Sequence, residues 1–322
     1  MNSPALGMSI AALVAALATI YLWPSKTSEH AAVTPLNALR ARAVAPSASG
    51  SSESVSSTID YKNLLAESSD YWAYAHNILP AAIAGNADAQ FYLSTVIDRC
   101  SMDNKMYFQR RGVTLAVDQG LQWALQRHLS IDVAQAVYDR CHKFLESDAR
   151  DLGSADDWLA RATAAGQPLA QATTALRLFT QQTLQSAQGA GGAPNPDAPP
   201  RIDSQQDPRQ LLRAAVESRD PEVLFSIGAA QGYLDAQNPD PTLSQFAWWL
   251  VACERGLDCS ANAEWVKIAC VHDPRCASFT VPSDLVRTLS GDDWRNVEQL
   301  AHEISAKLDA GQWDELNIED HQ

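Results

Sequence analysis

The chain is short of charge, and basic residues are scarcer than acidic ones. Charged residues make up 19% of the 322 positions, with 24 Lys and Arg against 38 Asp and Glu, a formal net charge of −14. A protein that binds a phosphate backbone needs clustered Lys and Arg to displace counterions, and no basic run occurs here. The composition therefore argues against nucleic acid as a partner. Ordinary solubility is our preferred explanation of the acidity, with attraction to a basic partner as the alternative.

Recognisable catalytic and cofactor motifs are also missing. The sequence has no His-Glu-x-x-His pair, no Gly-x-Ser-x-Gly elbow and no glycine loop that would cradle a phosphate. The acidic pairs at 156–157 and 292–293 are typical of helix starts, where carboxylates meet the positive end of the helix dipole. We therefore expect no catalytic residue, no metal site and no cofactor. The seven histidines are scattered, at positions 30, 76, 128, 142, 272, 302 and 321.

Strand patterns are absent as well, because no β-branched residues alternate with polar ones between turn residues. Apolar residues recur instead at helical spacing, as with Tyr92 and Val96 in the first half and Leu243, Phe246 and Leu250 in the second. The expected fold class is all-α.

One long uncharged segment covers residues 4–23. As a helix it would span roughly 30 Å, the thickness of the hydrocarbon layer of a membrane. Tyr21 and Trp23 stand where interfacial aromatic residues are expected, and no small-x-small cleavage site ends the run. We expect residues 1–25 to be an uncleaved membrane anchor, with a cleaved signal peptide as the alternative. The basic residues, from Lys26 onward, all follow the run, so the positive-inside rule alone favours a cytoplasmic body.

The cysteines favour the opposite side of the membrane. An even number of cysteines is typical of an oxidising compartment, where pairs stay bridged. We therefore place the body in the periplasm, anchored to the inner membrane, or exported if the N-terminal segment is cleaved. All six cysteines are predicted to form disulfides: Cys100, Cys141, Cys253, Cys259, Cys270 and Cys276.

The spacing of the cysteines leaves the pairing partly open. A bridge between Cys100 and Cys141 would join neighbouring helices, and two buried thiols are the alternative. The last four are spaced by five residues within each pair, which does not match the two-residue gap of a zinc knuckle. They would form two local loops, 253 with 259 and 270 with 276, or a staple between helices, and zinc remains an alternative.

Two low-complexity segments divide the chain. Residues 26–60 are rich in Ser, Ala and Pro and are predicted to be a disordered tether. Residues 186–206 are rich in Gly and Pro and are predicted to be a linker. We therefore expect two helical halves, 61–185 and a Cys-containing half at 207–322.

A short pattern recurs three times in the first of these halves. Ala-Gln pairs begin at positions 89, 134 and 170, separated by 45 and then 36 residues, which is the period of stacked helix pairs. A glycine precedes two of the pairs and can adopt the left-handed conformation that ends a helix. The residues predicted to have structural roles in these repeats are Gly85, Ala89, Gln90, Ala134, Gln135, Gly166, Ala170 and Gln171.

Residues 81–90 and 164–171 resemble the Sel1-like repeat family, relatives of tetratricopeptide repeats. Units of this family have an Ala-rich first helix that ends in Gly and a second helix that opens with Ala-x-Ala-Gln. The middle unit departs from the pattern, with Ser130 in place of the glycine. The resemblance covers about residues 65–185 and implies an α-solenoid that mediates protein contacts. Residues 248–259 are similar to Cys-containing helical tails of uncharacterised bacterial envelope proteins.

Two adjacent tryptophans, Trp248 and Trp249, are the candidate partner-binding residues. Neighbouring positions on one helix point in different directions, so we expect one of the two side chains to face a groove, the other half or a partner. Burial under the last helix is the alternative.

Together these features predict a non-enzymatic scaffold or adaptor of the bacterial cell envelope that binds another envelope protein. The alternative is an envelope enzyme of the wall-polymer hydrolase type with the repeats as scaffold, since two carboxylates could still face each other across a cleft. A cytosol-facing zinc-binding regulator is the third possibility.

Overall fold

The computed structural model describes most of the chain beyond the predicted tether. The described residues are 59–110, 113–126, 131–146, 149–188, 207–234, 241–260 and 290–316, together with positions 263, 284, 286 and 287. The predicted anchor, Cys270 and Cys276 lie outside them, as do most of the tether and the linker. No described helix combines the length and the hydropathy that a membrane crossing requires.

Helices dominate the described residues, which confirms the all-α fold class. The one exception is a two-residue antiparallel ladder of β1 (Gln109–Arg110) and β2 (Val113–Thr114). The first half contains α3 (Tyr61–Glu67), α4 (Tyr71–Ile83), α5 (Ala87–Tyr107), α6 (Val117–Gln126), α7 (Ile131–Glu146), η1 (Ala149–Leu152), α8 (Ala155–Ala164) and α9 (Pro168–Gln188). The second contains α10 (Pro208–Glu217), α11 (Pro221–Leu234), α12 (Pro241–Glu254), η4 (Gly291–Asp293), α15 (Trp294–Ala310) and η5 (Trp313–Leu316).

Short polar side chains fix several helix starts. The side chain of Asn86 accepts from the backbone N–H of Ala89 at 2.8 Å, and that of Ser154 accepts from Asp157 at 3.0 Å. A cap of this kind satisfies a backbone donor that the first helical turn leaves unpaired. The predicted helix start at the acidic pair 156–157 is therefore confirmed.

Two glycines end helices as predicted. Gly85 has φ 93° and Gly166 has φ 81°, both in the left-handed region. At each turn the glycine N–H bonds three residues back and the next N–H bonds five residues back, which is the Schellman arrangement. The chain then reverses at once into α5 or α9.

A third left-handed turn, with a different hydrogen-bond pattern, joins α10 to α11, and the sequence pattern did not reveal it. Arg219 takes the place of the glycine with φ 57°, the only positive φ of a non-glycine residue in the described part. Its N–H bonds to the carbonyl of Val216 at 2.9 Å, and the N–H of Asp220 bonds to the Ser218 hydroxyl oxygen at 3.2 Å. The Asp220 side chain caps α11 by accepting from the backbone N–H of Glu222 at 2.8 Å. The turn was missed because an arginine replaces the glycine and no Ala-Gln pair follows.

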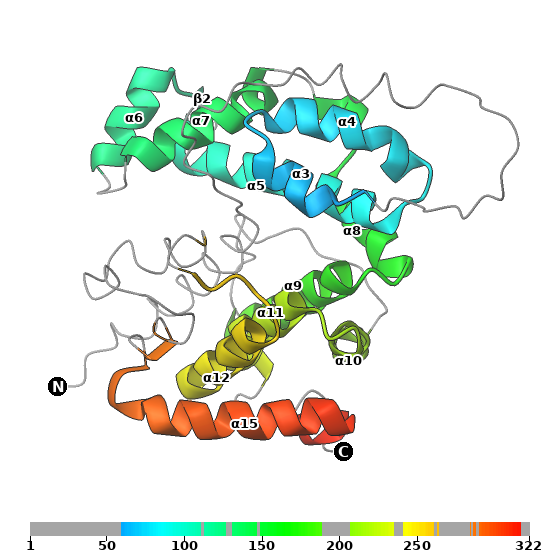
Figure 1. Ribbon diagram of the computed structural model, residues 1–322. Coiled ribbons are helices and arrows are strands. Elements are labelled where there is room, and N and C mark those ends of the chain that lie inside the picture. Colours follow the sequence, from blue (N-terminus) through cyan, green and yellow to red (C-terminus); the bar gives the residue numbers. More distant parts are fainter. Residues whose placement is uncertain are drawn as a thin grey trace, which may run out of the picture.

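The helix pairs do not stack in the order that the repeat predicts. Figure 1 shows α4, α5 and α8 in one group, with α9, α11 and α12 crossing beside it and α15 along the outer edge. Helix α5 packs directly against α8, α9 against α10 and α11, and α12 against both α11 and α15. Helix α7 packs on α5 and α4, so the α6–α7 unit lies beside the first pair rather than between the first and third pairs.

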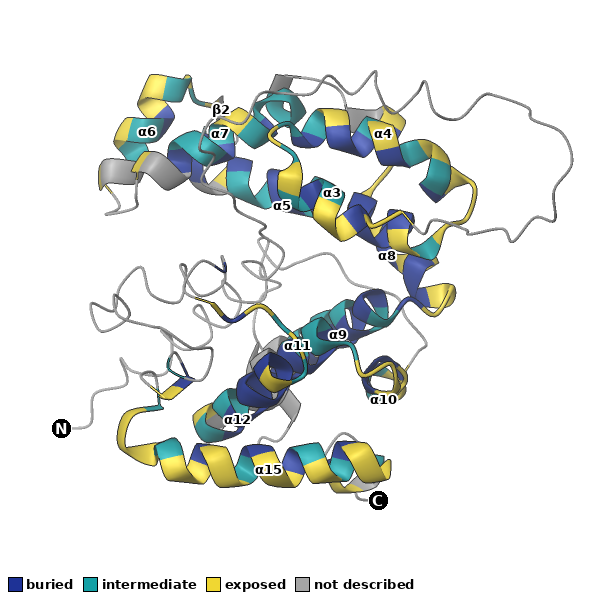
Figure 2. Cartoon of the chain, in the orientation of Figure 1, coloured by how far each residue is buried: buried dark blue, intermediate teal, exposed yellow. Residues whose placement is uncertain are grey.

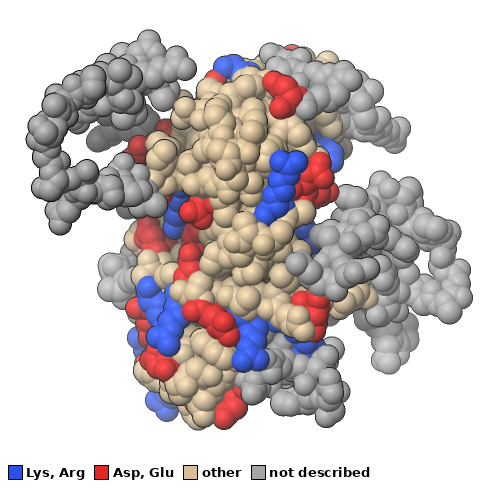
Figure 3. Space-filling view, turned by 90° about the vertical axis from the view of Figure 1, so that its right-hand side faces the viewer, with Lys and Arg blue, Asp and Glu red and all other residues tan. Residues whose placement is uncertain are grey.

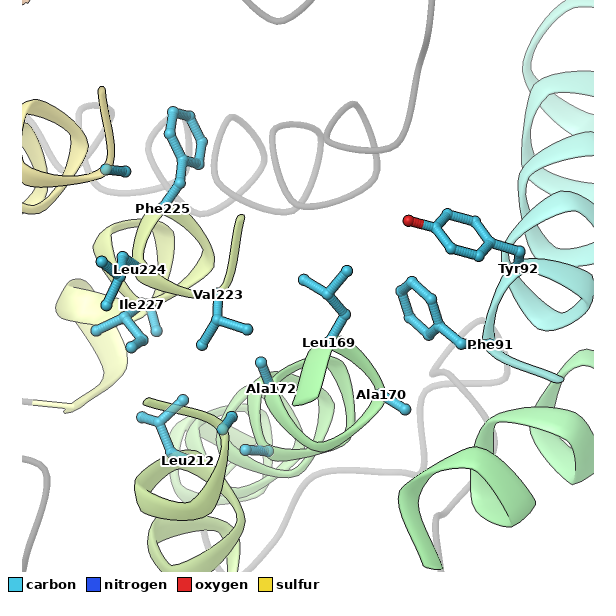
Figure 4. Packing of buried hydrophobic residues seen from close by; sticks show 14 of the residues in the cluster. Phe91, Tyr92, Leu169, Ala170, Ala172, Leu212, Val223, Leu224, Phe225 and Ile227 are labelled. Carbon is cyan, nitrogen blue, oxygen red and sulfur yellow. The ribbon is translucent and has the colours of Figure 1, made fainter. Parts of the chain in front are cut away.

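One hydrophobic cluster runs through both predicted halves. It extends from Tyr61 to Leu316 and includes residues of α5, α9, α10 and α11 that meet side by side in Figure 4. Helix α15 turns an apolar side toward α12 and an exposed side to solvent, as Figure 2 shows. Among the described residues the two predicted halves share a single core. The α6–α7 unit has a small separate cluster around Phe108 and Val137.

The left-handed turns predict opposite effects for two opposite substitutions. Replacing Gly166 by Val should lower the free energy of unfolding by about 1–2 kcal/mol, because a β-branched residue is strained at positive φ. Replacing Arg219 by Gly should raise it by about 0.5 kcal/mol, because the same strain is relieved. Urea titration measures both changes. Ala165→Val is the matched control, since Ala165 lies one residue earlier with φ −78°, and an equal loss in that control would contradict the explanation.

Candidate functional site

The first predicted disulfide is confirmed. Cys100 on α5 and Cys141 on α7 are bridged, with 5.1 Å between their Cα atoms, and both side chains are buried. The bridge closes a separation of 41 residues and ties the α6–α7 unit to the first helix pair. Next to it the side-chain amide of Asn104 donates to the backbone carbonyl of Cys141 at 3.2 Å.

The second disulfide joins Cys253 to Cys259, with 5.7 Å between their Cα atoms and a separation of 6 residues. It closes the turn that follows α12. This agrees with the local-loop alternative for these two cysteines. The described residues contain no group of three or more His, Cys, Asp or Glu side chains placed to hold a metal ion.

The repeat residues have structural roles where the structure describes them, but the three units are not equivalent. Ala89, Ala134 and Ala170 are all completely buried. The Gln90 side chain donates to the carbonyl of Ala82 at 3.0 Å and so ties α5 to α4. Gln135 bonds only to Asp139 on its own helix, at 2.8 Å, and Gln171 is half-buried on α9.

The expected exposure of one tryptophan is wrong. Trp248 is 1% and Trp249 is 3% exposed, because α12 is covered by α11 on one side and α15 on the other. The Trp249 ring stacks on Phe225 with 4.6 Å between the ring centroids. It lies against Gly228, where the absence of a side chain leaves room for the ring. A Cβ atom at position 228 would lie 2.7 Å from the Trp249 ring. Neither tryptophan is available to a partner.

Acidic side chains from three helix starts converge where α3, α5 and α11 begin. We call this set the acidic seam: Asp60, Asp88, Asp220 and Glu222. Asp60 caps α3 by accepting from Asn63 N–H at 3.0 Å, and Asp220 caps α11 by accepting from Glu222 N–H at 2.8 Å. Asp88 lies in the first turn of α5. Helix starts favour carboxylates because the dipole presents its positive end there, so the clustering follows from the way the helix pairs meet.

One lysine faces the acidic seam. Lys62 forms an ion pair with Glu222, whose side chain is 19% exposed. Burial raises the pKa of Glu222, the ammonium of Lys62 opposes that rise, and the carboxylates of Asp220 and Asp60 add to it. The ion pair joins α3 to α11, two helices from the two predicted halves.

Tyrosines line the inner side of the acidic seam. The Tyr74 hydroxyl donates to the carbonyl of Tyr61 at 3.0 Å. Tyr92 is 8% exposed, and Figure 4 shows its hydroxyl pointing away from α5 on the side of α11. Burial raises the pKa of Tyr92, and the nearby charges of Glu222, Asp220 and Asp88 raise it further, so the hydroxyl keeps its proton.

A second polar cluster lies at the joint of α4, α5 and α7. Arg99 bonds to Asp103 at 3.3 Å, and the guanidinium carbons of Arg99 and Arg140 lie 6.0 and 5.8 Å from the centre of the buried Tyr71 ring. Burial raises the pKa of Asp103, and the two arginines oppose that rise. Lys143 on α7 also pairs with Asp70, the cap of α4. These contacts hold the α6–α7 unit in place.

The sequence did not single out the acidic seam. Its members are separated by up to 162 positions, and only the packing of α11 on α9 brings them together. The available signals were the helix caps at Asp60 and Asp220, which point to helix starts but not to neighbouring ones. No protein family, curated protein or solved structure matches the chain. The Sel1-like resemblance therefore stays a prediction.

Removing the disulfides separately should give unequal losses. Because loop entropy grows with loop length, the double variant Cys100→Ala/Cys141→Ala should lower the free energy of unfolding by about 4 kcal/mol, against about 2 kcal/mol for Cys253→Ala/Cys259→Ala. Guanidinium titration of both double variants checks the order. A larger loss for the shorter loop would contradict the explanation from loop length.

The Lys62–Glu222 pair predicts a pH dependence. Because the pKa of Glu222 is raised in the folded state, this side chain contributes to stability below the ordinary carboxyl pKa. That contribution is lost as the pH rises through the pKa that Glu222 has in the folded protein. Lys62→Met should therefore cost about 1 kcal/mol at pH 7.5, and the cost should shrink as the pH falls toward 5. Unfolding free energies at several pH values test this. Adding Glu222→Gln should abolish the pH dependence of the loss, and a loss that is constant with pH would contradict the assignment.

Proposed function

We propose that the protein is a membrane-tethered, non-enzymatic scaffold or adaptor of the bacterial cell envelope, which binds another envelope protein through an α-solenoid of Sel1-like helix pairs. Three helix hairpins, each turned by one residue at positive φ, support the solenoid: α4–α5, α8–α9 and α10–α11. They pack in series on one core. Helix pairs arranged in this way cannot bury their faces alone and leave an extended surface for a partner.

The observation that carries this proposal is the acidic seam. It lies at the starts of α3, α5 and α11, and its carboxylates at Asp60 and Asp88 are exposed. Figure 3 shows charges of both signs interspersed on the face toward the viewer, with broad uncharged areas between them. The two disulfides support an oxidising compartment such as the periplasm.

A wall-polymer hydrolase is the second candidate, because the acidic seam brings carboxylates together and burial raises the pKa of Glu222. A glycosidase needs one protonated and one charged carboxyl on opposite sides of the bond that it cleaves. Lys62 opposes the rise in the pKa of Glu222 and already occupies its carboxylate in an ion pair. The scaffold is therefore the better-supported function.

Photo-crosslinking in the native envelope tests the scaffold. A photoreactive residue at position 84, exposed at the α4–α5 turn beside the acidic seam, should give a discrete protein adduct. The same residue at position 310, exposed at the end of α15, is the matched control and should give none. Purified protein should release no soluble fragments from isolated cell wall. Fragment release that Glu222→Gln abolishes, without an adduct at position 84, would favour the hydrolase.

A further inference from the structure

The α6–α7 unit shares little apolar core with the rest of the protein. Figure 1 shows it at one end of the first group of helices, where α7 packs on α5 and α4. Its own buried cluster lies at the end of α5, around Phe108 and Val137. Among the described residues of α6 and α7, Cys141 is the only buried member of the main core, and Phe144 is the only partly buried residue that packs against it. The bridge from Cys141 to Cys100 is therefore the main link between this unit and that core.

Two polar side chains at the joint of α4, α5 and α7 are incompletely paired. Tyr71 is 1% and Asn104 is 2% exposed. The hydroxyl oxygen of Tyr71 and the side-chain oxygen of Asn104 have no hydrogen-bond partner in the described part of the chain. A buried polar atom without a partner disfavours the closed joint, because the atom has given up its hydrogen bonds to water. Closing α7 over these atoms therefore has a cost that the rest of the joint must offset.

The other contacts across the joint orient α7 but are small. The ion pair between Lys143 and Asp70 is partly exposed, and ion pairs of this kind contribute little because water screens them. The Phe144 ring meets the Trp72 ring edge-on, with 5.1 Å between their centroids. A disulfide constrains the chain more strongly than either contact, because it limits the separation of the two helices covalently.

We infer that the Cys100–Cys141 bridge is a redox latch, which keeps α7 closed on α4 and releases it when a dithiol reduces the bridge. The released unit stays attached to the end of α5 through the cluster around Phe108, and the polar atoms of Tyr71 and Asn104 become accessible to water. The main core stays folded, because the unit contributes so little to it. The latch does not depend on the proposed scaffold function.

The chemistry is a thiol–disulfide exchange with a protein dithiol or a small-molecule dithiol. One thiolate of the dithiol attacks a sulfur of the bridge, the S–S bond breaks, and the released cysteine thiolate takes up a proton. The second thiol then displaces the other cysteine, so the dithiol ends as a disulfide and Cys100 and Cys141 end as two thiols. Both cysteines are buried, so the attack requires α7 to move away from α4 first.

Hydrogen exchange measured by mass spectrometry tests the latch on the full-length chain in a mild detergent, before and after treatment with dithiothreitol. Thiol labelling shows which cysteines have been reduced. When Cys100 and Cys141 are reduced, the amides of α7 should exchange at least about tenfold faster, and those of α9 and α11 should change less than about twofold. The double variant Cys100→Ala/Cys141→Ala should behave like the reduced protein. The matched control Cys253→Ala/Cys259→Ala lacks the other described bridge and should keep the protection of α7.

A further variant tests the cost of closing the joint. Tyr71→Phe removes the unpaired hydroxyl, so it should slow the exchange of α7 in the reduced protein by about fivefold. The matched control is Tyr74→Phe, which removes a hydroxyl that donates to the carbonyl of Tyr61 at 3.0 Å and should not slow that exchange.

Three results would overturn the latch. Unchanged exchange of α7 after complete reduction would show that packing holds the unit without the bridge. An equal acceleration in α7, α9 and α11 would show that the bridge stabilises the whole fold instead of one unit. A bridge that dithiothreitol reduces only when the whole protein is unfolded would show that α7 does not open by itself. If a double variant fails to fold, the comparison of the oxidised and reduced natural chain decides.

Discussion

Helix α9 is the element on which the rest of the structure depends. It packs against α8 on one side and against α10 and α11 on the other, so it needs buried residues around much of its circumference. Its small residues Ala170, Ala172 and Ala175 are completely buried, and Leu178 and Phe179 fill the wider gaps. Small side chains allow helix backbones to approach closely, and large ones supply the apolar area that stabilises the contact. The two predicted halves therefore form one body.

The same packing creates the acidic seam. Each left-handed turn places the start of a second helix close to its neighbour, and helix starts select carboxylates for capping and for their interaction with the dipole. Carboxylates that stabilise separate helices thus become neighbours, and their mutual repulsion is only partly relieved by Lys62.

Local features were predictable from the sequence, whereas the neighbours of each element were not. The all-α class and the glycine turns at Gly85 and Gly166 follow from short-range chemistry, since periodicity and φ preference act within a few residues. The Cys100–Cys141 bridge was predicted instead from the expectation that their two helices are neighbours. The turn at Arg219 was not predicted from the sequence, because arginine is unusual at positive φ. The burial of Trp248 and Trp249 was not predicted, because it depends on α15. This helix lies about fifty residues further along the chain and covers the second face of α12. The position of the α6–α7 unit beside the stack likewise depends on contacts between distant helices.

Native-state hydrogen exchange tests most directly whether one core unites both halves. In increasing denaturant, the most protected amides of α5 and α8 and those of α11 and α12 should converge on the same free energy of global opening, because α9 couples them. If α10–α12 and α15 kept their protection under conditions in which α4, α5 and α8 had already exchanged, the halves would be independent and the account would be wrong.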